Sequence, residues 1–206
     1  QTNKQTIDEG FSIIDKIEII HYQAHPDLGI TFKTRKYLNQ FIDHLLENVT
    51  QKMAQIIEKN DQKVINCADI EKILSCFHMA GDVLNFEIRE AYKCVDKLHS
   101  NKNFSLVIPI NTIRNYIQKR ITNGKINDDA YYFIEYAIET LLVIILENSG
   151  NISRDHRREY ISLRSTIIAL IKDEELSFLF QNINNRELRK NFIPKPFKVN
   201  RLVDTF

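Results

Sequence analysis

The sequence has little of what sheet proteins need. Among 206 residues there are five glycines, four prolines and no tryptophan. Between Ile30 and Phe104 there is no proline and a single glycine, Gly81. A sheet protein turns about every dozen residues and usually places Gly or Pro in those turns. We therefore expect a mostly helical protein.

Cysteine pairs and membrane-spanning segments are also missing. The three cysteines, Cys67, Cys76 and Cys94, are an odd number without CxxC spacing. This predicts reduced thiols that fill the core, in an intracellular or intravirion setting. The longest apolar run covers 141–146 and is flanked by glutamates, well short of the roughly 20 apolar residues that a bilayer requires. We expect no membrane partner.

The chain carries almost no net charge, +1, from 28 basic and 27 acidic side chains. The two halves differ, however. Residues 1–100 hold 12 basic and 15 acidic side chains, a net of −3, whereas residues 101–206 hold 16 and 12, a net of +4. A hydrophobic share of 43% with 27% charged residues is typical of a globular protein and excludes a disordered polymer.

Apolar residues in the first half recur at steps of three and four, which predicts one long amphipathic helix. They are Leu38, Phe41, Ile42, Leu45, Leu46, Val49, Met53, Ile56 and Ile57. The helix should begin near Thr31, whose hydroxyl can cap it, and end near Asn60. Shorter helices are expected over 11–24, 70–77 and 82–98.

The second half repeats this order about 95 residues later, which indicates an internal duplication. A short helix is expected over 110–117, a long one over 128–156 and another short one over 163–170. One such triplet cannot bury both faces of its long helix. Two triplets should therefore clasp each other, with Leu45 and Val49 packed against residues such as Leu141 and Ile145.

Particular segments of both halves resemble the core histones. HPDLGI (25–30), Lys33, Asn39, Phe41 and HMAGDV (78–83) are similar to the two-B-type histone. Further matches point to the two-A-type histone: Pro109, Glu139, LENSGNISRD (146–155) and IKDEEL (171–176). In this order, over about residues 11–181, they resemble the doublet histones of giant viruses of the Marseilleviridae type.

This resemblance implies an all-α chain with two tandem histone folds, paired as an intramolecular heterodimer. It divides the chain into a two-B-type fold with its C-terminal helix (1–100), a two-A-type fold (101–181) and an extended docking tail (182–206). The basic part of the tail, 186–201, contains Pro194 and Pro196. Fusion would give the two folds a millimolar or higher effective concentration for each other.

The implied function is structural packaging of viral double-stranded DNA, without sequence preference, in a nucleosome-like particle. The chain would supply the two-A/two-B part of that particle. A second doublet, or histones of the other two core types, would complete it. The implied location is the virion and the viral factory or host nucleus.

DNA contacts in this family lie at paired loops and at helix N-termini, where backbone amides and Arg side chains meet the phosphates and the minor groove. The residues that match these positions or lie close to them are Thr31, Lys33, Lys63, Arg114, Lys119, Arg120, Lys125, Arg154, Arg157 and Arg158. Taken alone, each lysine is better explained as a solvated surface charge, whereas the coincidence of these residues with two loop regions favours DNA contacts. Some family positions are not basic here, as in Asp61-Gln62 and at Thr112, Asn115 and Gln118, so we expect weaker DNA binding than in cellular histones.

A second set of residues matches the acidic patch of nucleosomes, which docks basic peptides. These residues are Asp82, Glu90, Glu139, Glu147, Asp173, Glu174 and Glu175. Ile144 stands where a further acid is expected. The alternative is a solvated helix face with carboxylates at a helix start. Asp155 and Arg164 match a structural ion pair of the family.

Catalytic and cofactor motifs are not recognised, and we expect no enzyme, metal or cofactor. His21, His25 and Asp27 have a spacing that suits zinc, but Pro26 ends the helix and no further ligand follows closely. Aromatic residues such as Phe133 have the spacing of core packing rather than of stacking platforms.

The rival function is a regulatory histone-fold module that binds mainly proteins. Low net charge favours it, whereas the acidic set, the DEEL segment and the long tail disfavour it.

Overall fold

A computed structural model describes residues 11–59, 64–78, 80–100 and 105–182. Lys63 and the predicted docking tail beyond Asn182 lie outside these residues, so the predictions made for them stay predictions. No helix in the described part of the chain is both long and apolar enough to cross a bilayer.

The described residues form a short-long-short helix triplet twice, as predicted. The helices are α1 (Ile14–Ala24), α2 (Phe32–Lys59), α3 (Cys67–Ser75), α4 (Asp82–His99), α5 (Ile110–Gln118), α6 (Asp128–Asp155), α7 (Leu163–Lys172) and α8 (Glu174–Asn182). The strands are β1 (Gly29–Ile30), β2 (Val64–Ile65), β3 (Lys125–Ile126) and β4 (Tyr160–Ile161). The separate helix α8 was not predicted. Asp173 lies in an extended conformation after α7, and its Oδ1 accepts the Leu176 N–H at 3.0 Å, which starts the new helix.

Hydroxyl and amide side chains cap three of the described helices, of which the Thr31 cap was predicted. The Thr31 Oγ1 accepts the Thr34 N–H at 3.2 Å and caps α2. The last helix of each triplet begins with a reciprocal capping box, in which the cap side chain binds the N3 amide and the N3 side chain binds the cap amide. Asn66 and Asp69 form the box of α3, and Ser162 and Ser165 form that of α7.

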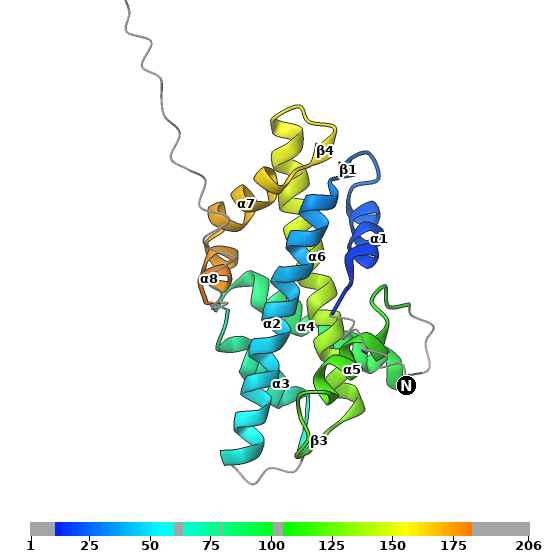
Figure 1. Ribbon diagram of the computed structural model, residues 1–206, viewed down its shortest axis with the longest axis vertical. Helices are drawn as coiled ribbons and strands as arrows, with labels where there is room; N and C mark the ends of the chain where they lie inside the picture. The colour runs from blue at the N-terminus through cyan, green and yellow to red at the C-terminus, as the bar shows by residue number, and fades with distance from the viewer. Residues whose placement is uncertain (1–10, 60–63, 79, 101–104, 183–206) are drawn as a thin grey trace, which may run out of the picture.

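Each loop of one triplet is hydrogen-bonded to a loop of the other. β1 pairs in parallel with β4, Gly29 opposite Tyr160, and β2 pairs in parallel with β3, Val64 opposite Lys125. We call these the first and second loop pairs. They lie at opposite ends of the long axis of the molecule, with α1 and α5 along one flank between them (Figure 1). We call this side the α1–α5 flank.

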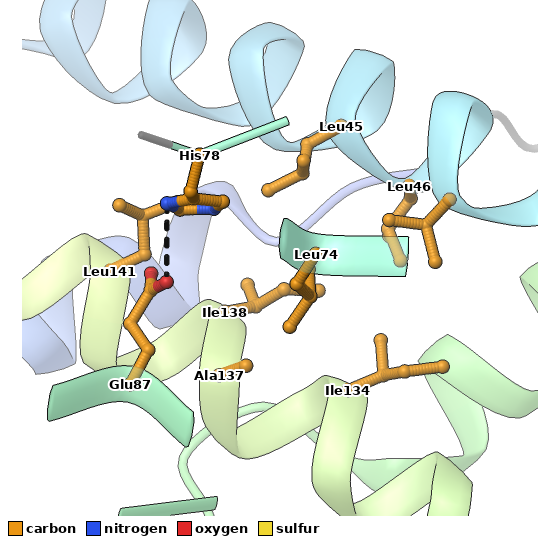
Figure 2. A pocket seen from close by; sticks show the side chains of 10 residues that line it. Leu45, Leu46, Leu74, His78, Glu87, Ile134, Ala137, Ile138 and Leu141 are labelled. Carbon is orange, nitrogen blue, oxygen red and sulfur yellow. Dashed lines mark ion pairs between the residues drawn. The ribbon is translucent and has the colours of Figure 1, made fainter. Parts of the chain in front are cut away.

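The two triplets share one core. Leu45 and Val49 of α2 line the same cavity of about 10 Å³ as Leu141 of α6 (Figure 2). This agrees with the packing predicted for these residues. At the interface of α4 and α6, the Tyr92 and Phe133 rings meet edge to face, with centroids 4.9 Å apart. The apolar faces of both long helices are therefore covered within one chain.

The N-terminal helix α1 packs closely on α6. A Cβ added to Gly150 would lie 2.1 Å from Nε2 of the buried His25, so only glycine allows this approach. One nitrogen of each histidine has a backbone partner: Nε2 of His21 lies 2.7 Å from the Leu28 carbonyl oxygen, and Nε2 of His25 lies 3.3 Å from that of Glu147 on α6. These two histidines therefore position α1 and the turn after it.

Candidate nucleic-acid interface

The first loop pair brings together the side chains predicted from both halves. Thr31 and Lys33 follow β1, whereas Arg154, Arg157 and Arg158 precede β4. The Thr31 N–H donates to the Ile161 carbonyl at 3.1 Å, which fixes the start of α2 against the second triplet. Five predicted DNA-binding residues thus lie at one end of the molecule, although about 125 positions separate the two groups.

Arg157 adopts a conformation that favours glycine, with φ of 52°. Its N–H donates to the Arg154 carbonyl at 2.8 Å, and the Arg158 N–H donates to the Ser153 carbonyl at 2.9 Å. This is the Schellman pattern that ends many helices, where the left-handed residue is usually glycine. Here an exposed arginine occupies that position. Its backbone is strained, and its charged side chain lies at the surface.

The Arg154 guanidinium is already paired within the protein. Its Nε and Nη2 donate to the two carboxylate oxygens of Asp27, at 3.2 and 2.5 Å. The hydrogen bond from Arg154 lowers the pKa of Asp27. This pair ties the turn after α1 to the end of α6 and removes one positive charge from the first loop pair.

The predicted DNA-binding side chains near the second loop pair are lysines and arginines. Lys125 is exposed and lies opposite Val64. Lys119 is exposed after the end of α5. The guanidinium of Arg120 lies 3.6 Å from the Tyr116 ring centroid and donates to the Tyr116 carbonyl at 3.1 Å.

Arg114 is also held against the protein. Its Nη1 lies 2.9 Å from Oδ1 of Asp128, and its guanidinium lies 4.8 Å from the Tyr131 ring centroid. Two of the predicted DNA residues near this end therefore have partners on the protein surface.

Three of the seven predicted acidic residues bind backbone amides. Glu175 accepts the N–H groups of Asp82 and Val83 at 2.9 and 2.8 Å and thereby caps α4. Asp173 caps α8, and Oε1 of Glu139 accepts the Ile108 N–H at 2.6 Å. These carboxylates stabilise helix starts and a loop.

The other four predicted acids differ in their surroundings. Glu90 lies 2.7 Å from the Lys93 ammonium, whose hydrogen bond lowers the pKa of Glu90. Asp82, Glu147 and Glu174 are exposed. The surface therefore offers fewer free carboxylates than the sequence pattern suggested.

The predicted ion pair involves residues on either side of the same loop. Asp155 is the last residue of α6, and Arg164 is the second residue of α7. Both are exposed. An ion pair between them stays a prediction.

The sequence did not predict that a histidine and a glutamate are buried together. Nδ1 of His78 lies 3.5 Å from Oε2 of Glu87, and both side chains are 2% exposed (Figure 2). Burial lowers the pKa of His78 to about 4. Burial and the Glu175 carboxylate raise the pKa of Glu87 well above its usual value. His78 is therefore uncharged at neutral pH, and burial favours the protonated form of Glu87. Glu87 lies three residues after Leu84 and four before Ala91, which is the signal that it belongs to the apolar face of α4.

A second buried acid, Glu135, was also missed. It is fully buried in α6, and neither of its carboxyl oxygens meets a hydrogen-bond donor among the described residues. Burial, together with the neighbouring Glu139 carboxylate, raises its pKa to about 11. Glu135 is therefore protonated at neutral pH and can donate to Glu139.

This arrangement of helices is similar to that of a solved structure. The crystal structure of the histone from Methanopyrus kandleri matches with a TM-score of 0.54, over 77% of this chain and 93% of that chain. The chain has the histone fold. Because the sequence identity is 13%, the likeness concerns the fold alone. No protein-family model matches the chain.

In terms of the histone fold, the chain holds two helix triplets clasped within one polypeptide. Each long helix begins in one loop pair and ends in the other. The loop residues Thr31, Lys33 and Lys125 thereby receive their positions from packing between the triplets.

Proposed function

We propose that this protein packages double-stranded DNA structurally, by binding its backbone without sequence preference. The observation that carries the proposal is the first loop pair, which gathers Thr31, Lys33, Arg157 and Arg158 beside the N-terminus of α2. Helix N-termini and exposed cations are suited to phosphate groups. Contacts of this kind position a duplex and carry no direct sequence information.

The spacing of the two loop pairs supports a duplex as the ligand. They lie at opposite ends of α2, which has 28 residues. At 1.5 Å per residue this helix is about 42 Å long. A duplex presents the same face of its backbone again after one turn, about 34–36 Å. The two loop pairs are thus somewhat more than one turn of duplex apart, so a duplex running along the α1–α5 flank could meet both at successive or nearby phosphates.

DNA binding by the chain alone is expected to be weak. Arg154, Arg114 and Arg120 already have partners on the protein, and the net charge is only +1. Each phosphate contact contributes about 0.9 to the slope of log affinity against log salt. A slope of about 3 to 5 is therefore expected, from the exposed cations at the two loop pairs.

Our finer proposal is that the chain is a histone doublet of the giant-virus type, which supplies the two-A/two-B part of a nucleosome-like particle. The clasp of two triplets within one chain and the sequence resemblance support it. A second doublet, or histones of the other two core types, would complete the particle, with the segment 182–206 as docking tail. Its place would be the virion and the viral factory or host nucleus.

Two experiments test packaging. Affinity for a duplex of mixed sequence should fall steeply with salt and should not depend on sequence. Mixing the chain with a partner doublet and a defined length of DNA, followed by nuclease digestion, should leave a protected fragment. If no fragment is protected and no particle forms, packaging is refuted.

The second candidate is a regulatory histone-fold module that binds mainly proteins. The pairing of Arg154 with Asp27 and of Arg114 with Asp128 favours it, because both pairs reduce the charge available to DNA. Negligible DNA binding at physiological salt would support this function. The exposed acids Asp82, Glu147 and Glu174 would then be its docking surface for basic peptides, which alanine substitution at these positions would weaken.

A further inference from the structure

An exposed phenylalanine lies directly after β1, beside the first loop pair. Phe32 is the first residue of α2, between the capping Thr31 and Lys33, and its side chain is 61% exposed. A single exposed apolar residue is ordinary on a protein surface. Phe32 differs from such residues because an arginine lies beside its ring and because exposed cations lie near it.

An arginine of the same helix, itself paired with α1, lies beside the ring. The guanidinium of Arg35 lies 5.6 Å from the ring centroid of Phe32, and Arg35 forms an ion pair with Glu18 of α1. The Arg35 side chain is only 16% exposed. Its charge is thus compensated by Glu18, and its guanidinium links the Phe32 ring to a residue of α1. Helix α1 belongs to the α1–α5 flank (Figure 1).

The surroundings of Phe32 combine aromatic and cationic side chains. Tyr160, 46% exposed, lies on β4 opposite Gly29, and Lys33, Arg157 and Arg158 are exposed on the same loop pair. Gly29 has no side chain that could cover Tyr160. Cations with exposed rings between them are typical of surfaces that contact bases as well as phosphates.

We propose that Phe32 is an apolar wedge that enters the minor groove of duplex DNA and partly unstacks one base step. The inference rests on the proposed function, because the neighbouring cations must first hold the duplex. Apolar side chains placed in this way kink DNA, and pyrimidine–purine steps such as TA yield most easily. The wedge would therefore give a packaging protein a mild preference for flexible steps.

The chain offers a matched control for the experiment. Phe86 of α4 is 41% exposed, and the guanidinium of Arg89, also three residues later, lies 5.2 Å from its ring centroid. It has the same chemistry as Phe32 but belongs to neither loop pair. Phe32→Ala, Phe32→Leu and Phe86→Ala would be compared with the unchanged full-length chain.

The probe is a duplex of 30 base pairs that carries one TA step with 2-aminopurine beside it. The unchanged chain and Phe86→Ala should raise 2-aminopurine fluorescence, which reports unstacking. Phe32→Ala should abolish the rise and weaken binding about tenfold, or 1.4 kcal/mol, with the salt slope unchanged. Phe32→Leu should keep most of both effects, because a wedge needs apolar bulk rather than an aromatic ring.

The outcomes distinguish a failure of the wedge proposal from a failure of the proposed DNA-packaging function. If the unchanged chain does not bind the duplex, both are overturned. If it binds with a normal salt slope but Phe32→Ala equals the unchanged chain in fluorescence and affinity, the wedge alone is overturned. A loss on Phe32→Ala that is larger for a single strand than for the duplex also overturns the wedge and indicates base stacking instead.

Discussion

The carboxylate of Glu175 accepts the backbone N–H of Asp82 at 2.9 Å and thereby joins α8 to the start of α4. A second hydrogen bond, from the Val83 N–H at 2.8 Å, completes this cap. The neighbouring Gly81 leaves room for it, since an added Cβ would lie 2.4 Å from the carboxyl carbon of Glu175. One residue of the predicted acidic set therefore stabilises the fold.

Gly81→Ala and Glu175→Ala should destabilise the protein to a similar extent. Each removes the same cap of α4, which is worth about 1–2 kcal/mol. The Gly81 backbone is extended, so alanine adds no conformational penalty there. The double variant should lose little more than either single variant, as measured by urea unfolding. Gly29→Ala is the control, because its Cβ would make an ordinary 3.5 Å contact with Tyr160. Additive losses would show that the two positions act separately.

Asp27→Asn should strengthen DNA binding. The change removes a negative charge from the first loop pair and weakens the hold on Arg154, whose guanidinium can then turn to a phosphate. We expect a salt slope steeper by about 0.9, measured by fluorescence anisotropy with a labelled duplex. Asp43→Asn removes a carboxylate on α2 instead and should alter binding less. An unchanged slope in Asp27→Asn would mean that Arg154 does not reach DNA.

Arg157→Gly should stabilise the protein but weaken its binding to DNA. Glycine relieves the left-handed strain at φ of 52°, for a net gain of about 0.5–1 kcal/mol after its greater freedom in the unfolded chain. The salt slope should fall by about 0.9 with the lost charge. Arg158→Gly should lower the slope equally without any gain in thermal stability. If Arg157→Gly leaves DNA binding intact, the arginine has another role.

Glu135→Gln should remove part of the loss of stability at alkaline pH. The pKa of Glu135, about 11, lies above that of an unfolded glutamate, about 4.3. The unfolded chain therefore loses its proton first, and the stability contributed by the protonated acid falls as pH rises from about 4 to 11. Glutamine cannot titrate and can still donate to Glu139.

The variant should match the unchanged protein near pH 4 and exceed it at pH 8 by an amount on the order of 1–3 kcal/mol. Chemical unfolding over a series of pH values measures this difference. Glu147→Gln, an exposed carboxyl of the same helix, is the control and should leave the pH dependence as it is. Parallel curves for Glu135→Gln and the unchanged protein would mean that Glu135 is ionised when folded.

The long helices could be predicted because their signals are local. The recurrence from Leu38 to Ile57 lies within one helix, and Thr31 caps that helix through a residue only three positions away. The helix start at Asp173, whose capping of Leu176 is local too, was only the alternative interpretation of these acids, because the DEEL segment was interpreted as the end of a fold. The strand pairs had no local signal, since each is two residues long and its partner is distant in the chain.

The sequence predicted which residues belong to the candidate site. It did not predict which of their charges are free to bind a ligand. Sequence patterns placed Arg154 and Arg114 in the DNA-binding set and Glu175 in the acidic set. The structure gives each of them a partner within the protein that the sequence does not reveal. His78 and Glu87 show the converse. Their types suggest surface positions, yet α3, α4 and both long helices enclose them (Figure 2). Whether a charged side chain forms an ion pair or a hydrogen bond depends on distances between residues that only the folded structure fixes.

The sequence by itself determined the two helix triplets, their caps and the scarcity of net charge, because helix periodicity and capping act over three or four residues. The tertiary structure decided which charges remain available to a ligand. Ion pairs such as Arg154 with Asp27 join residues 127 positions apart. They form only when the two triplets have packed, since the free energy that brings them together comes from the shared apolar core.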